Sequence, residues 1–254
     1  MFDLITPDWD IAGIQTVIFD KDGTLMDSHK YWGRIVELRA YEVAQTFGIA
    51  PYAVSGICRA MGWDTEARKL LSKGPVALVG RDQVIGALCM FLKERHRVEA
   101  DVLEVGKIFD HVGALFQNEM LDYVTVLPGV YSFLERLKQV GARMGIVTSD
   151  SLTAVPKILS HLGISDYFDI IIGRESCPQA KETGIPCKMA MEHLDADPWR
   201  TIVVGDAPVD MQMAGLNGAM GVGVATGQIG EDVLRKYTDC TAPDMELFVV
   251  GIHD

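Results

Sequence analysis

The sequence predicts an α/β protein whose core is a Rossmann-like, doubly wound parallel sheet, with an all-helical domain inserted into it. Short apolar runs, rich in β-branched residues or flanked by glycine, recur along the chain without strict alternation. Strands of this kind are usually buried on both faces, as in a parallel sheet. Helical patterns separate the runs, and such strand–helix alternation indicates right-handed crossovers.

The individual elements follow from these runs. The first strand ends at Phe19, directly before a pair of aspartates. Further strands are predicted over residues 143–147, 168–172, 201–205 and 220–225. Helices are predicted over residues 128–140, 151–162, 187–194 and 209–216, with glycines or prolines at several of their ends.

The stretch between the first and second strands is far too long for a single crossover. It carries helical patterns over residues 31–47, 82–95 and 101–122 and no clear strand pattern. We therefore expect an inserted helical domain over residues 28–123. The α/β core is then formed by residues 1–27 and 124–254.

Composition narrows the class of protein. The chain has 254 residues, 48% of them hydrophobic, and a net charge of −12. This charge argues against nucleic acid or an anionic membrane surface as a partner. No apolar run approaches the roughly 18 residues of a membrane span, and the acidic start is unlike a signal peptide. Five scattered cysteines without a CxxC pair indicate reduced thiols and a cytoplasmic protein.

The end of the first strand carries the strongest chemical signal. Asp20 and Asp22 lie two residues apart, and on a strand such residues point the same way. Gly23 follows and permits a sharp turn, so both acids can face one small pocket. Two carboxylates held that close repel each other unless a cation neutralises them or one of them keeps its proton.

Further polar residues follow the other predicted strands. Thr148 and Ser149 come after the second strand, and Asp206 and Asp210 follow the strand over residues 201–205. In open α/β sheets, ligands bind outside the carboxyl ends of the strands, so these groups should share one rim. Hard carboxylate oxygens of this kind suit Mg²⁺ together with a substrate phosphate.

These residues match a known pattern. The segments DKDGTL at 20–25 and GDAPVD at 205–210, with a hydroxyl residue after the second strand and a downstream lysine, resemble the haloacid dehalogenase-like superfamily of phosphohydrolases. The segment LPGVYSFLERLK at 127–138 resembles the phosphoglycolate phosphatase-like branch. The helical insertion is similar to the mobile cap of that branch.

The resemblance implies a role for each residue. Asp20 would be the nucleophile that forms an aspartyl-phosphate, and Asp22 the general acid and base. Thr148 would donate a hydrogen bond to a phosphoryl oxygen. Mg²⁺ would be held by Asp20, by the backbone carbonyl of Asp22 and by Asp206, with Asp210 as ligand or support. Further phosphate contacts are expected from three residues near these motifs: Gly23, Thr24 and Ser149.

The phosphate-neutralising lysine has two candidates. In the family a lysine precedes a proline, and counting back from Ala190 leads to Lys181, which Glu182 follows instead. Lys188 is the competitor, although it falls inside a predicted helix. We favour Lys181.

The expected function is Mg²⁺-dependent hydrolysis of a small phosphorylated metabolite, such as a phosphoglycolate-like monoester, by a monomer or homodimer. A phosphomutase remains an alternative, as does a phosphonatase, for which Lys73 would have to form a Schiff base. The second aspartate, Asp22, disfavours a dehalogenase. A phosphate-binding regulatory module without catalysis is the alternative from another class.

Overall fold

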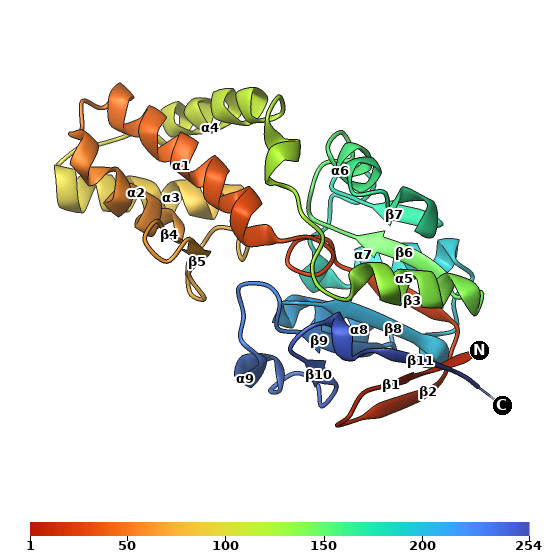
Figure 1. The fold of residues 1–254 in the computed structure, drawn as a ribbon. Helices are drawn as coiled ribbons and strands as arrows, with labels where there is room; N and C mark the ends of the chain where they lie inside the picture. Colours follow the sequence, from red (N-terminus) through yellow and green to blue (C-terminus); the bar gives the residue numbers. More distant parts are fainter. Residues whose placement is uncertain (254) are drawn as a thin grey trace. The chain divides into compact units, whose positions relative to one another are not determined.

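The structure, a computed structural model, describes residues 1–253 and is drawn in Figure 1. The chain forms two compact units. One unit contains residues 1–27 together with the chain from Thr125 onward, and the other is Ser28–Val124.

The first unit is built on a six-stranded sheet in the order β10-β9-β8-β3-β6-β7, and every neighbouring pair in it is parallel. Its strands are β3 (Thr16–Phe19), β6 (Arg143–Val147), β7 (Ile170–Ile172), β8 (Thr201–Gly205), β9 (Met220–Val224) and β10 (Thr241–Ala242). Thr16 is in register with both Arg143 and Thr201, so the carboxyl ends of β3, β6 and β8 lie level. The predicted α/β fold class is confirmed.

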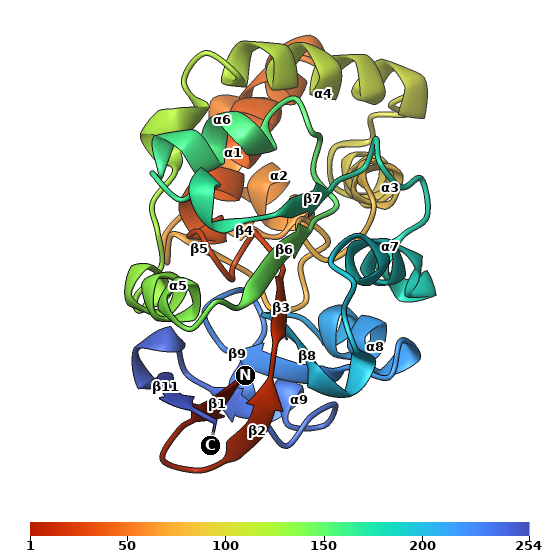
Figure 2. The same ribbon diagram turned by 90° about the vertical axis from the view of Figure 1, so that its right-hand side faces the viewer.

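Helices cover both faces of this sheet. Figure 2 shows α5 on one side of it and α7 and α8 on the other. Successive residues of β3 face opposite sides of the sheet. Ile18 belongs to an apolar cluster with residues of α7 and α8. The Phe19 ring packs edge-on against Phe133 of α5. The helices of this unit are α5 (Val130–Gln139), α6 (Val155–His161), α7 (Ile185–His193), α8 (Pro208–Leu216) and α9 (Glu231–Leu234).

A small antiparallel sheet, in the order β11-β1-β2, joins the two ends of the chain. Its strands are β1 (Phe2–Ile5), β2 (Asp10–Ile14) and β11 (Val249–Ile252). The Asp3 carboxylate accepts a hydrogen bond from the Gly13 backbone and lies 2.6 Å from His253 Nδ1. β1 and β2 pair as a short local hairpin, and β11 joins them from the other end of the chain; none of these three strands was predicted.

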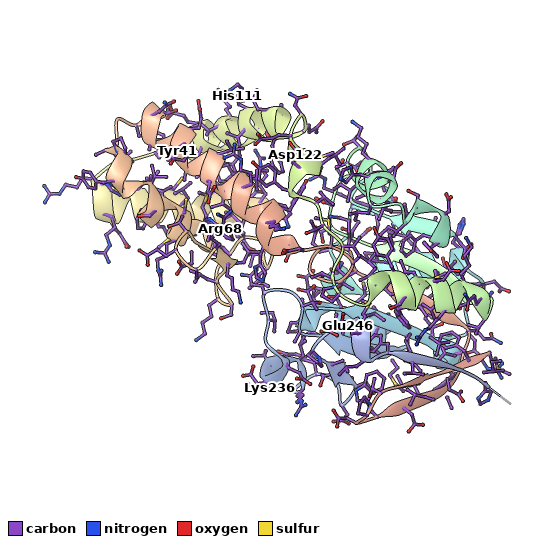
Figure 3. All side chains as sticks on the ribbon, in the orientation of Figure 1. Tyr41, Arg68, His111, Asp122, Lys236 and Glu246 are labelled. Atoms are coloured by element: carbon purple, nitrogen blue, oxygen red, sulfur yellow. The ribbon has the colours of Figure 1, made fainter. Side chains whose placement is uncertain are left out.

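The insertion was predicted to be all-helical; the second unit is mostly helical but also contains two short paired strands. Its helices are α1 (Ser28–Thr46), α2 (Val54–Met61), α3 (Arg81–Phe91) and α4 (Val102–Phe116), and its strands are β4 (Trp63–Asp64) and β5 (Lys69–Leu70). Tyr31 of α1 packs edge-on against Phe116 of α4. Figure 3 labels Tyr41 and His111 on α1 and α4, and both side chains are exposed.

The helices of this unit differ in part from the predicted ranges. The pattern over residues 101–122 is divided into α4 and a short 3₁₀ turn, η3 (Met120–Tyr123). The pattern over 82–95 becomes α3 followed by the π-helical turn η2 (Leu92–His96), which the left-handed Arg97 ends. Helix α2 and the β4–β5 hairpin were not predicted, since both are short.

Two further observations concern the helices and the cysteines. Among residues 1–253, no helix is both long and apolar enough to cross a bilayer. All five cysteines are free: Cys58, Cys89, Cys177, Cys187 and Cys240.

Candidate active site

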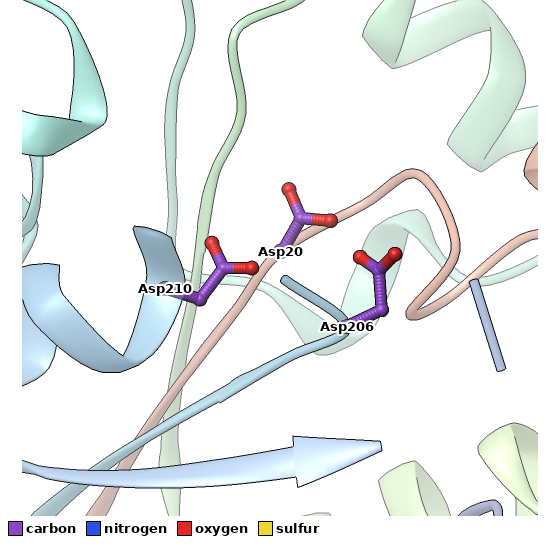
Figure 4. A group of neighbouring side chains, drawn as sticks. All are labelled: Asp20, Asp206 and Asp210. Carbon is purple, nitrogen blue, oxygen red and sulfur yellow. The ribbon is translucent and has the colours of Figure 1, made fainter. Parts of the chain in front are cut away.

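Three aspartates meet at the carboxyl end of the six-stranded sheet. Asp20 directly follows β3 and Asp206 directly follows β8, the neighbouring strand, while Asp210 lies in the first turn of α8. All three are buried, and one oxygen from each lies within 4.8 Å of the others. Figure 4 shows their carboxylates turned toward a common space. The strand order thus brings together residues that are far apart in sequence.

Lys181 completes this cluster. It opens the 3₁₀ turn η5 (Lys181–Thr183), is only 8% exposed, and donates hydrogen bonds to Asp20 and to Asp210 Oδ1, the latter at 2.9 Å. Lys188 lies elsewhere: its side chain is 67% exposed and its ammonium is 3.9 Å from Glu192, one turn along α7. Of the two candidate lysines, Lys181 is the one that reaches the aspartates.

The charges of the cluster are unbalanced. Burial, together with the nearby Asp20 and Asp210 carboxylates, raises the pKa of Asp206 well above its usual value. Burial likewise raises the pKa of Asp210 to about 6, although Lys181 acts against it. Burial lowers the pKa of Lys181, but the two adjacent carboxylates outweigh that effect and raise it above its ordinary range. One ammonium therefore offsets three carboxylates only in part.

This imbalance fits a divalent cation. A cation among the three carboxylates would supply the missing positive charge, and hard oxygen donors are those that Mg²⁺ prefers. The residues that would hold it are Asp20, Asp206 and Asp210. The Asp22 side chain is not part of this group, and its backbone carbonyl stays a predicted ligand.

Asp206 lies in a tight space formed by backbone. Thr24 Oγ1 is 3.3 Å from Asp206 Oδ1 and donates to it. A Cβ added at Gly23 would lie 2.6 Å from Asp206 Oδ2, and one added at Gly227 would overlap the same carboxylate. The Thr226 hydroxyl donates to the Gly23 carbonyl at 2.6 Å, and this hydrogen bond holds the segment before Gly227 close to Gly23. Gly23 and Thr24 thus contact a predicted metal ligand directly.

This close packing predicts the effect of a methyl group at position 23. Gly23 has φ +83° and Gly141 has φ +70°, but no atom lies within 4 Å of a Cβ added at Gly141. Both alanine variants should therefore lose about 1–2 kcal/mol of stability from the left-handed backbone. Gly23→Ala should lose about 1–3 kcal/mol more through overlap with Asp206. Denaturant unfolding without metal measures both, and equal losses would contradict the proposed contact.

Asp22 faces a different partner. Its Oδ1 lies 2.5 Å from the ammonium of Lys21, which is also 3.0 Å from Asp150 Oδ2. Burial raises the pKa of Asp22 to about 6, with Asp150 and Asp20 adding to the shift and Lys21 opposing it. A carboxyl group with a pKa near 6 can both give and take a proton near neutral pH.

The hydroxyl residues after β6 differ in exposure. Thr148 is buried, its backbone N–H donates to Ile172, and its Oγ1 accepts from the Asp150 N–H at 3.2 Å. Ser149 is exposed. Both lie at the carboxyl end of β6, next to β3 in the sheet.

Sequence reasoning missed two features of this site. It assigned no role to Lys21, although this charged residue lies between two aspartates at the end of an apolar strand. It also passed over Gly227, for which nothing in the local sequence signals contact with Asp206, because that contact depends on the fold.

Comparison with known proteins agrees with this architecture. A family model described as haloacid dehalogenase-like hydrolase matches residues 14–218. The chain is 28% identical over 236 residues to the phosphoglycolate phosphatase of Neisseria meningitidis, covering 92% of this chain and 89% of that protein. It is also 28% identical over 239 residues to the phosphoglycolate phosphatase of Salmonella typhimurium, covering 90% and 88%.

Solved structures share the fold. A predicted phosphoglycolate phosphatase from Haemophilus somnus superposes with a TM-score of 0.72 at 20% identity, covering 91% of this chain and 95% of that one. A β-phosphoglucomutase from Clostridium difficile gives 0.62 at 20% identity, covering 92% of each. With the family match extending over most of the chain, the protein belongs to the haloacid dehalogenase-like hydrolases.

Proposed function

We propose that this protein is a Mg²⁺-dependent phosphatase that hydrolyses a small phosphate monoester through an aspartyl-phosphate on Asp20. The observation that carries the proposal is the buried group of Asp20, Asp206 and Asp210 with Lys181. Because one ammonium balances three carboxylates only in part, the group can bind a cation. The cation and Lys181 together can then bind an anionic substrate. The similarity to phosphoglycolate phosphatases supports phosphoglycolate as the first substrate to test.

In the first step, an Asp20 carboxylate oxygen attacks phosphorus and the ester P–O bond breaks. Asp22 gives its proton to the departing oxygen, so the product leaves as an alcohol. Lys181 offsets the repulsion between the phosphate dianion and the aspartate, and Mg²⁺ held by Asp20, Asp206 and Asp210 would supply further positive charge there. Thr148 would donate to a phosphoryl oxygen, and Ser149 lies next to it in the chain.

In the second step, water attacks phosphorus and the bond between phosphorus and Asp20 breaks. Asp22, now a carboxylate, accepts a proton from that water, which restores both residues and releases inorganic phosphate. The unit Ser28–Val124 is proposed as the cap that selects the substrate. The free cysteines support a reducing compartment such as the cytoplasm.

The test is phosphate release from a panel of monoesters, with Mg²⁺ or with EDTA. The panel contains phosphoglycolate, glycerol phosphate, sugar phosphates and p-nitrophenyl phosphate. We expect release with Mg²⁺, fastest from phosphoglycolate, and none above background with EDTA. Asp206→Asn is the control, since it should remove the Mg²⁺ dependence and most of the activity together.

Two results would overturn the proposal. One is the absence of phosphate release from every member of the panel in the presence of Mg²⁺. The other is conversion of a sugar phosphate to its isomer without release of phosphate, which would identify a phosphomutase.

A further inference from the structure

Lys21 is a fully buried lysine whose side chain has no exposed surface. It lies between Asp20 and Asp22, the proposed nucleophile and the proposed general acid. An ammonium in such a place is strongly unfavourable unless charged partners compensate it. The mechanism proposed above gives this residue no task.

The partners of Lys21 are specific. Its ammonium is 2.5 Å from Asp22 Oδ1, 3.0 Å from Asp150 Oδ2 and 3.5 Å from the sulfur of Met26. The contact with Asp22 is a charge-assisted hydrogen bond, which is strong and directional, and the contact with Asp150 is an ion pair. The Asp22 side chain remains 17% exposed. One Asp22 oxygen is therefore bound to the protein, while part of the Asp22 side chain stays exposed to solvent.

The same lysine also reaches the adjacent strand. Asp150 follows β6 and donates its backbone N–H to Thr148 Oγ1 at 3.2 Å. Since β3 and β6 are neighbours in the sheet, Lys21 joins the segment that carries Asp22 to the segment that carries Thr148. The turn after β3 gives further support, because the Lys21 carbonyl accepts from the backbone N–H groups of Leu25 and Met26.

We propose that Lys21 is a positioning residue that holds the Asp22 carboxyl group where it can pass a proton to the departing oxygen of the substrate. Asp150 forms a second ion pair with the ammonium. The inference rests on the proposed phosphatase function. Lys21 acts through Asp22 and does not contact the phosphoryl group.

The experiment compares two leaving groups in Lys21→Met, which keeps the length of the side chain and removes its charge. Glycerol phosphate releases an alkoxide, which needs a proton, whereas p-nitrophenyl phosphate releases a stable phenolate, which does not. The ratio kcat/KM reports the steps up to departure of the leaving group. We expect this constant to fall roughly 10–100-fold for glycerol phosphate and less than about threefold for p-nitrophenyl phosphate.

Two controls separate positioning from general damage. Asp22→Asn should give the same selective loss, because it removes the proton donor itself. Leu137→Ala, which opens a cavity in buried α5, should lower the melting temperature without changing the ratio between the two substrates. An equal loss for both substrates in Lys21→Met would overturn the inference.

A second variant tests the same point if Lys21→Met does not fold. Asp150→Asn keeps the size of the side chain and the Lys21–Asp22 contact, but loosens the ammonium. A smaller loss confined to glycerol phosphate supports the inference, and an unchanged ratio contradicts it. Wild-type protein that releases phosphate from no monoester of the panel would instead refute the phosphatase function, so the two failures are distinguishable.

Discussion

Asp20→Asn is expected to abolish phosphate release while leaving the fold intact. The amide cannot attack phosphorus, so turnover should fall by roughly 10³-fold or more. Stability should change by only about 1 kcal/mol, because Lys181 keeps its contact with Asp210 and repulsion between Asp20 and Asp206 is relieved. Initial rates with phosphoglycolate and thermal unfolding measure the two effects.

Detection of the covalent intermediate provides an independent test of the role of Asp20. Wild-type protein quenched in acid during turnover should carry acid-stable, hydroxylamine-sensitive phosphate, and Asp20→Asn should carry none. An Asp20→Asn protein that turns over at near wild-type rates would exclude Asp20 as the nucleophile.

Lys181→Met is expected to have the second-largest effect, on both activity and stability. Removing an electrostatic group that faces developing charge lowers kcat by roughly 10²–10³-fold. The buried Asp20 and Asp210 also lose their cationic partner, which lowers the free energy of unfolding without metal by about 3–5 kcal/mol. Mg²⁺ should restore part of that stability by binding the folded state.

Lys188→Met is the matched control, because it removes the same charge from the next lysine along the chain. Its contact with Glu192 is long and exposed, so its loss should change stability by less than about 0.5 kcal/mol. Activity should stay near that of the wild type. If Lys188→Met were the inactive variant and Lys181→Met the active one, the lysine assignment would be reversed.

The positions of Asp20 and Asp206 could be predicted from the sequence, since each directly follows a buried apolar run. The strand over residues 201–205 has the predicted bounds in the structure, and Asp206 comes next in the chain. The choice between Lys181 and Lys188 was harder. It depends on the path of the chain after β7, which brings Lys181 to Asp20 across 161 positions.

The contact of Lys21, helix α2 and the small sheet could not be predicted, because each depends on a turn, a short element or a distant strand. A strand pattern places Lys21 on the face opposite the two aspartates, but the strand has ended at Phe19 and the following turn lets its ammonium reach Asp22. Helix α2 was missed because it is short, and Gly56 weakens its helical pattern. In the small sheet, β11 finds its partner β1 only when the ends of the chain meet.

The two ends of the inserted unit lie close together in the backbone of the core. Asp27 donates its N–H to the Thr125 carbonyl at 2.9 Å, and Met26 forms a bridge with Val126. The chain therefore leaves the core and returns to it at adjacent points. Insertions with closely spaced ends are those that a host domain tolerates best. We therefore expect that another domain whose ends are similarly spaced can replace the segment between these points without changing the strand order of the parallel sheet.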